Sequence, residues 1–131
     1  MMHYAWLMAR IFITLGAING FLAVALGAFA AHGLKQRIDP DMLAVFETGA
    51  RYHSIHSVAL VAVGLLALHH ASGSLSAAGI SLLVGMLLFS GSLYVMAVTG
   101  IRGLGAITPF GGLALLAGWA LMAYSAWRDL A

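Results

Sequence analysis

Long stretches of hydrophobic residues alternate with short polar ones along this chain. The first apolar stretch covers about residues 11–31, and no Asp, Glu, Lys or Arg occurs between Arg51 and Arg102. A helix of about 20 apolar residues is long enough to cross the hydrocarbon core of a bilayer, which is roughly 30 Å thick. The uncharged stretch between the two arginines is therefore long enough for two crossings joined by a turn.

This pattern predicts four membrane-spanning helices, at about residues 11–31, 50–68, 76–98 and 108–127. The turn between the second and third spans is expected at His69–Ser74, where His, Ser and Gly cluster. Asp39 followed by Pro40 predicts a helix start, with interfacial first turns that lead into the second span. We therefore expect one all-α integral membrane domain over residues 1–131, an up-and-down bundle of four transmembrane helices.

The composition agrees with a membrane protein and excludes several other classes. The chain is 63% hydrophobic and 8% charged, whereas about a quarter of the residues of a typical soluble domain are charged. Its six Lys and Arg residues are scattered singly, so we expect no nucleic-acid binding. Cysteine is absent, which excludes disulfides, thiolate metal sites and cysteine nucleophiles.

Basic and aromatic residues indicate the expected membrane boundaries. The side of the first and third connections carries more basic residues than the side of the termini, so the positive-inside rule favours cytoplasmic connections and external termini. Three aromatic residues towards the end of the fourth span predict an aromatic belt at the membrane surface: Trp119, Tyr124 and Trp127.

Small residues on the first and third spans predict close helix packing. The expected packing positions are Gly16, Gly20, Gly27, Gly85 and Ser92, with Asn19 beside the first two. Small residues allow helix backbones to approach closely in a membrane, and a polar side chain such as Asn can hydrogen-bond to another helix. We expect Asn19 to form such a bond across the bundle.

Polar chemistry is concentrated just before and within the start of the second span, in residues 46–56. Glu47 and Arg51 are four residues apart with the acid first, the favourable order for an ion pair on a helix. His53 and His56 are three apart, and His32 ends the preceding span on the same side of the membrane. Imidazole binds zinc, copper, iron or nickel. Two hypotheses follow: a metal, haem or quinone site, or ordinary hydrogen bonds at helix ends.

Four sequence segments, spread over nearly the whole chain, resemble the YgdD/YwdK-like family of small inner-membrane proteins, known as domain of unknown function family 423. They are residues 27–35 (GAFAAHGLK), 46–56 (FETGARYHSIH), 89–94 (FSGSLY) and 107–112 (ITPFGG). The resemblance implies four spans and a bacterial inner-membrane location, and it brings no catalytic mechanism. His32, Tyr52 and His56 fall in the family-like segments, whereas His53 stands where a more ordinary polar residue is expected.

No sequence motif indicates catalysis, so we expect a protein that is not an enzyme and has no cofactor. The leading hypothesis is a protein that packs in the lipid bilayer as a homo-oligomer or as an accessory subunit of a larger membrane complex. The alternative is binding or transport of a small molecule, metal or quinone by a polar cluster: His32, Glu47, Arg51, Tyr52, His53 and His56.

Overall fold

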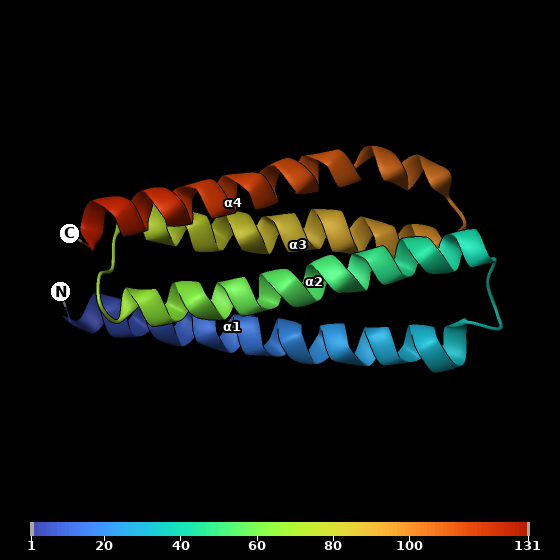
Figure 1. Cartoon of the computed structure of the whole chain (residues 1–131), viewed down its shortest axis with the longest axis horizontal. Helices are drawn as coiled ribbons and strands as arrows, with labels where there is room; N and C mark the ends of the chain where they lie inside the picture. Colours follow the sequence, from blue (N-terminus) through green and yellow to red (C-terminus); the bar gives the residue numbers. More distant parts are fainter. Residues whose placement is uncertain (1, 131) are drawn as a thin grey trace.

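Four long helices, each antiparallel to the next along the chain, make up the computed structural model, which describes residues 2–130 (Figure 1). They are α1 (Met2–Phe29), α2 (Pro40–Ala67), α3 (Gly73–Thr99) and α4 (Thr108–Asp129). A π-helical turn, η1 (Ala30–Leu34), extends α1, and a 3-10 turn, η2 (Arg102–Ala106), precedes α4. Within this range there is no β-strand. The expected all-helical class is therefore confirmed.

Local chemistry explains where several helices begin and end. Proline occupies the first turn of both α2 and α4, where its missing N–H costs no hydrogen bond. The Ser72 hydroxyl accepts a hydrogen bond from the backbone N–H of Leu75 at 3.2 Å and caps α3. At the other end of α3, Gly100 adopts a φ of 76°, a left-handed conformation that favours glycine.

The helices follow an up-and-down order, with α1 and α4 outermost and both termini at one end (Figure 1). The extensive packing is between consecutive helices: α1 with α2, α2 with α3, and α3 with α4. The bundle is therefore flattened, and α2 and α3 form its middle.

Glycines bring α1 close to α2 and α3 close to α4. A Cβ atom on Gly16 of α1 would lie 2.9 Å from the backbone nitrogen of Val61, and one on Gly64 of α2 would lie 2.9 Å from that of Ile13. The same reciprocal arrangement joins α3 to α4 through Gly85 and Gly118. Such distances leave no room for a side chain, so these positions permit the close helix approach typical of membrane proteins.

Two apolar clusters form the core, and polar residues lie between them. One cluster includes Phe12, Leu60 and Leu82 and occupies the half of the molecule nearer the termini. The other includes Leu34, Phe46 and Met96 and occupies the opposite half. The side chains between them along α2 and α3 include four buried polar ones: His53, His56, Ser57 and Ser90. Buried polar groups require hydrogen-bond partners, so this layer is where specific chemistry is concentrated.

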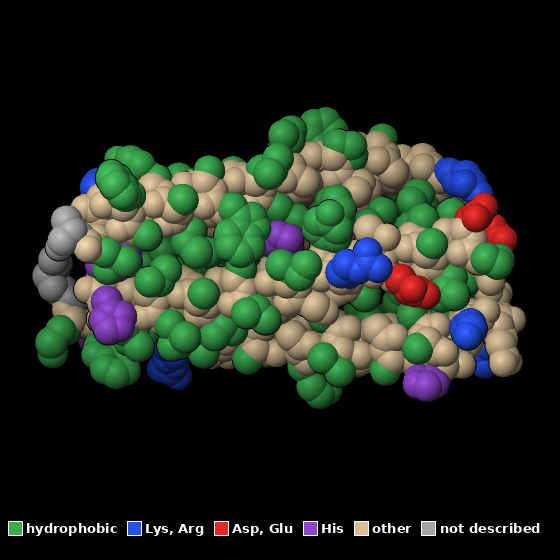
Figure 2. Space-filling model, in the orientation of Figure 1, with side chains coloured by type: hydrophobic (Ala, Val, Ile, Leu, Met, Phe, Trp, Pro, Cys, Tyr) green, Lys and Arg blue, Asp and Glu red, His purple; other side chains and the backbone are tan. Residues whose placement is uncertain are grey.

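Three helical segments are long and apolar enough to cross a membrane: Met2–Leu34, Gly73–Thr99 and Arg102–Asp129. The α2 helix is not among them, and three charged residues in its first half lower its hydropathy: Asp41, Glu47 and Arg51. Large apolar side chains cover much of the visible surface between the two ends (Figure 2). This surface suits contact with lipid.

Candidate functional site

A hydrogen-bonded chain of three side chains connects α1, α2 and α3 in the polar layer. The His53 side chain from α2 is buried, with 6% of its surface exposed. Its Nε2 atom lies 2.9 Å from Oδ1 of Asn19 in α1, and its Nδ1 atom lies 2.9 Å from the hydroxyl of Tyr94 in α3. Both ring nitrogens therefore have partners, and three helices are joined through one imidazole.

The partners of His53 determine its tautomer. The amide nitrogen of Asn19 donates to the carbonyl of Leu15 at 2.8 Å, so its Oδ1 atom faces His53 as an acceptor. His53 therefore donates from Nε2–H, and in the neutral ring Nδ1 accepts from the hydroxyl of Tyr94. This network needs no net charge, which suits a layer buried in the bundle.

His56 forms a second, separate set of contacts that reaches α4. The indole Nε1–H of Trp119 donates to His56 Nε2 at 3.0 Å. Because indole is only a donor, Nε2 is the acceptor, and Nδ1–H donates to the backbone carbonyl of Tyr52 at 2.6 Å. His56 is therefore the opposite tautomer to His53. Trp119 lies in the middle of α4, and the aromatic belt at the membrane surface stays a prediction.

The three histidines that were expected to converge have no contact partner in common. His53 bonds to α1 and α3, His56 bonds to α4, and His32 is exposed in the turn η1. Across residues 2–130, no three His, Cys, Asp or Glu side chains come together as possible metal ligands. The spacing of three residues along α2 did not produce a shared site because each imidazole is directed to a different neighbouring helix.

Glu47 and Arg51 do not form the expected ion pair. Both side chains are exposed, and the ion pair within 4.0 Å that occurs in the described chain joins Arg128 to Asp129 instead. Glu47 and Arg51 both line a groove of about 430 Å³ between α1 and α2. The other side chains along this groove are small or aliphatic: Ala23, Val24, Gly27, Ala30, Ala31, Ala50 and Ser54. The two opposite charges thus share a surface without a direct contact of 4.0 Å or less.

A larger groove of about 790 Å³ lies between α2 and α4, with Phe89 of α3 also lining it. Tyr52 packs against Phe89, with ring centroids 4.6 Å apart, and stacks on His56 with centroids 6.0 Å apart. Trp119 completes this wall of rings at an edge-to-face angle of 67° to His56. Arg51 also lines this groove. The groove is therefore aromatic and apolar, with a single cationic residue.

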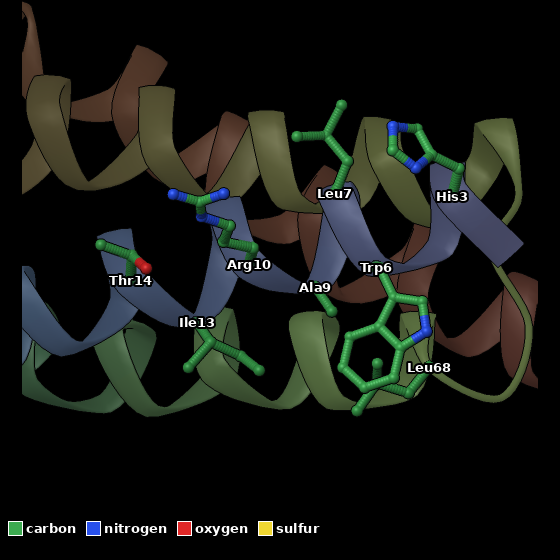
Figure 3. A pocket seen from close by; sticks show the side chains of 8 residues that line it. All are labelled: His3, Trp6, Leu7, Ala9, Arg10, Ile13, Thr14 and Leu68. Carbon is green, nitrogen blue, oxygen red and sulfur yellow. The ribbon is translucent and has the colours of Figure 1, made fainter.

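A third groove, of about 460 Å³, lies beside the start of α1, where Leu68 from the end of α2 lines it with seven residues of α1 (Figure 3). Figure 3 shows His3 and Arg10 on one side of α1 and Trp6 and Ile13 on the other. Its polar side chains do not converge, so this groove lacks the arrangement of a specific site. Trp6 and Arg10 there suit an anchor at the membrane surface.

A polar cluster at the same end of the molecule was missed by sequence reasoning. The buried hydroxyl of Ser125 lies 3.2 Å from that of Ser72 and 3.5 Å from Nε2 of His70, and it donates to the carboxylate of Asp129 at 3.2 Å. Asp129 accepts in turn from Nε of Arg128 at 2.7 Å. The available signal was a serine inside an otherwise apolar fourth span, opposite a turn rich in His and Ser. The contacts fasten the α2–α3 turn to the end of α4.

The expected packing residues have different surroundings. Gly16 and Gly85 lie at close helix contacts, and Ser92 joins α3 to the start of α4 through a 2.7 Å bond between its hydroxyl and that of Thr108. A Cβ atom on Gly20 would make an ordinary contact with Ser57 at 3.9 Å. One on Gly27 would meet nothing within 4 Å, so Gly27 lies at an open position of the α1–α2 groove.

Comparisons with known proteins identify relatives along most of the chain. Residues 26–112 match the family described as "Protein of unknown function (DUF423)". The chain is 48% identical to the UPF0382 membrane protein YwdK of Bacillus subtilis, over 92% of this chain and 99% of that protein. It is 37% identical to the UPF0382 inner membrane protein YgdD of Escherichia coli, over 92% of each. No solved structure matches. With three helices able to cross a bilayer, these matches show a multi-pass membrane protein.

Proposed function

This chain belongs to the DUF423 family of membrane proteins, and from that premise we propose that it works by assembly in the bacterial inner membrane. In this proposal it is a helix-packing subunit that associates with copies of itself or with a larger membrane complex, and it has no catalytic activity. The inner-membrane location is supported by the description of the Escherichia coli relative as an inner membrane protein.

The proposal includes α2 as a fourth membrane span. This helix has 28 residues, which corresponds to a length of about 42 Å and exceeds the roughly 30 Å of hydrocarbon. It packs along α1 on one side and α3 on the other, and both of these helices are candidate spans. A helix held antiparallel between two spans lies in the membrane with them, and its polar groups are tolerated because neighbouring helices bond them.

The single observation that carries the proposal is the exposure of Glu47 and Arg51 on the α1–α2 groove, where neither has an ion-pair partner within 4.0 Å among residues 2–130. If α2 is centred on the hydrocarbon, Glu47 and Arg51 lie about 5 and 11 Å inside it. Charged groups at such depths are costly unless they face protein, pair, or reach the surface. A second protein surface on this groove removes the cost of exposing both charges.

The experiment is native mass spectrometry of the full chain extracted from its own membrane with a mild detergent. We expect multiples of the chain mass, or one stoichiometric complex with another membrane protein. The double variant Glu47→Gln/Arg51→Gln is expected to shift the population towards monomer, because it removes both charges and keeps polar side chains at both positions. Arg102→Gln is the matched control, since this exposed arginine lies outside the groove. A wild-type protein that is monomeric and retains no partner contradicts the proposal.

A second candidate function is the binding of a quinone-type molecule in the α2–α4 groove. The observation that favours it is the wall formed by four rings, those of Tyr52, His56, Phe89 and Trp119, along about 790 Å³ of apolar space. Aromatic walls with a few polar groups are typical of small-molecule sites.

Mass spectrometry of organic extracts from the purified protein tests this second function. We expect one quinone per chain if it is correct, and its loss in Leu116→Trp, which adds bulk inside the groove. Leu87→Trp is the control, because the same bulk is added on an exposed position outside it. The absence of quinone from the wild-type extract contradicts this function.

A further inference from the structure

We propose that the partner on the α1–α2 groove is a second copy of this chain, and that Glu47 of each copy pairs with Arg51 of the other. This inference rests on the proposed function and names the partner. It predicts a two-fold symmetric dimer, with the axis along the membrane normal and two ion pairs between the chains.

The charge pattern of the groove is complementary to itself. In a two-fold interface, residue i of one chain contacts residue j of the other, and j contacts i in return. One acid and one base, both exposed and both without an ion pair in the described part of the chain, satisfy this requirement with no third charge. When the grooves of two copies face each other, Glu47 of each copy therefore lies opposite Arg51 of the other.

The depth of the two residues is compatible with this pairing. Glu47 and Arg51 are separated along the axis of α2 by about 6 Å. In a parallel dimer the two helices run in the same direction, so each arginine must reach about this distance along the axis towards the facing carboxylate. Long arginine side chains in membranes extend towards the nearer surface, and for Arg51 that is the direction of Glu47.

The shape of the groove permits another helix to approach. Gly27 has open space where a Cβ atom would lie, and Ala31 beside it is exposed. With Ala23 and Ala50, these residues line the groove of about 430 Å³ with small side chains that leave room for a neighbour. Small residues at such a surface allow backbones to come close, while the charge pair determines the register.

An anionic lipid is a weaker explanation for this groove. A phosphate group on Arg51 leaves Glu47 without a partner and places a second negative charge near it. A copy of the chain neutralises both residues at once, which favours protein over lipid as the occupant.

A charge-reversal experiment in trans tests the inference. The variants Glu47→Arg and Arg51→Glu are expressed with different affinity tags, separately and together, in full-length form. Each variant alone places like charges opposite each other, and we expect its self-association to weaken by at least about tenfold. Expressed together, the two variants have opposite charges at both contacts, so we expect them to co-purify as a one-to-one heterodimer. Arg102→Glu is the control and is expected to associate like the wild type.

The cis variant Glu47→Arg/Arg51→Glu separates the remaining outcomes, and circular dichroism checks that each variant folds. If the cis variant associates with itself and the two single variants do not associate together, the pairs lie within one chain and the inference is overturned. A wild-type complex with an unrelated membrane protein also overturns it, but leaves the proposed function standing. A wild type that is monomeric and partnerless overturns both.

Discussion

The indole of Trp119 donates a hydrogen bond to Nε2 of His56 across 3.0 Å, and this bond connects α4 to α2, two helices that are not consecutive in the chain. It occurs in the aromatic wall of the α2–α4 groove and leaves the imidazole with partners on both nitrogens. The imidazole of His56 therefore joins α2 to α4 through hydrogen bonds within the bundle.

Replacing Trp119 tests the importance of this bond. Trp119→Phe keeps an aromatic ring but removes the indole N–H that donates to His56 Nε2, so a buried acceptor loses its partner. We expect the free energy of unfolding to fall by about 1–3 kcal/mol, measured by reversible denaturation in mixed micelles. Trp127→Phe is the matched control, because Trp127 is 89% exposed. Equal effects of the two replacements contradict the assigned role.

The network around His53 predicts energetic coupling between α1 and α2. Asn19→Leu removes the acceptor for His53 Nε2–H, and His53→Leu removes the donor, so the two changes together cost less than the sum of the single changes. We expect a coupling energy of about 0.6 kcal/mol, the average for interhelical hydrogen bonds in membranes, and at most about 1.7 kcal/mol. The measurement is a double-mutant cycle by reversible denaturation. Asn19→Leu combined with His56→Leu is expected to be additive, since these residues share no bond.

Two adjacent glycines in α4 are expected to differ sharply in how much their replacement by alanine lowers the stability of the protein. A Cβ atom on Gly111 would lie 2.7 Å from Cα of Phe89, in the backbone of α3, whereas one on Gly112 would lie 3.8 Å from the ring of the same residue. Gly111→Ala therefore forces α3 and α4 apart, and we expect a loss of about 1–3 kcal/mol of stability. Gly112→Ala is expected to have little effect. Thermal unfolding of both variants checks the contrast, and similar melting temperatures contradict it.

The sequence predicts much of the fold because the information is local. Apolar length predicts the long helices, and the prolines at positions 40 and 109 lie in the first turns of α2 and α4. The family resemblance is confirmed by the matches over most of the chain. The helices and their ends depend on residues close together in sequence. Hydrophobic length and helix-end chemistry are therefore sufficient to predict them.

The site could not be predicted in the same way, because its contacts join distant residues. His53 and His56 are three residues apart, but their partners Tyr94 and Trp119 are determined by how α2 sits among three other helices. The Glu47–Arg51 spacing favours an ion pair on an isolated helix, yet the folded chain leaves both side chains exposed on a groove. A single sequence shows which residues are available for such contacts. It does not show how each helix is rotated about its axis, and this rotation determines which residues meet.

The absence of cysteine makes a direct test of the four-span topology possible. We expect Gln36→Cys and Gly103→Cys to react with a membrane-impermeant maleimide from the cytoplasmic side, and His69→Cys to react only from the outside. These positions lie in or beside the three connections, and all are exposed. The measurement is labelling of intact cells compared with opened membranes. If Gln36→Cys and His69→Cys react from the same side, α2 does not cross the bilayer.

The reciprocal glycines have a consequence for biosynthesis. Gly16 and Gly64 are matched within the first helical hairpin, and Gly85 and Gly118 within the second, so each hairpin holds its own close contact. A ribosome completes the first hairpin before it translates the second. Each pair of helices can therefore enter the lipid as a unit that is already joined, and the α2–α3 contacts form when the two units meet.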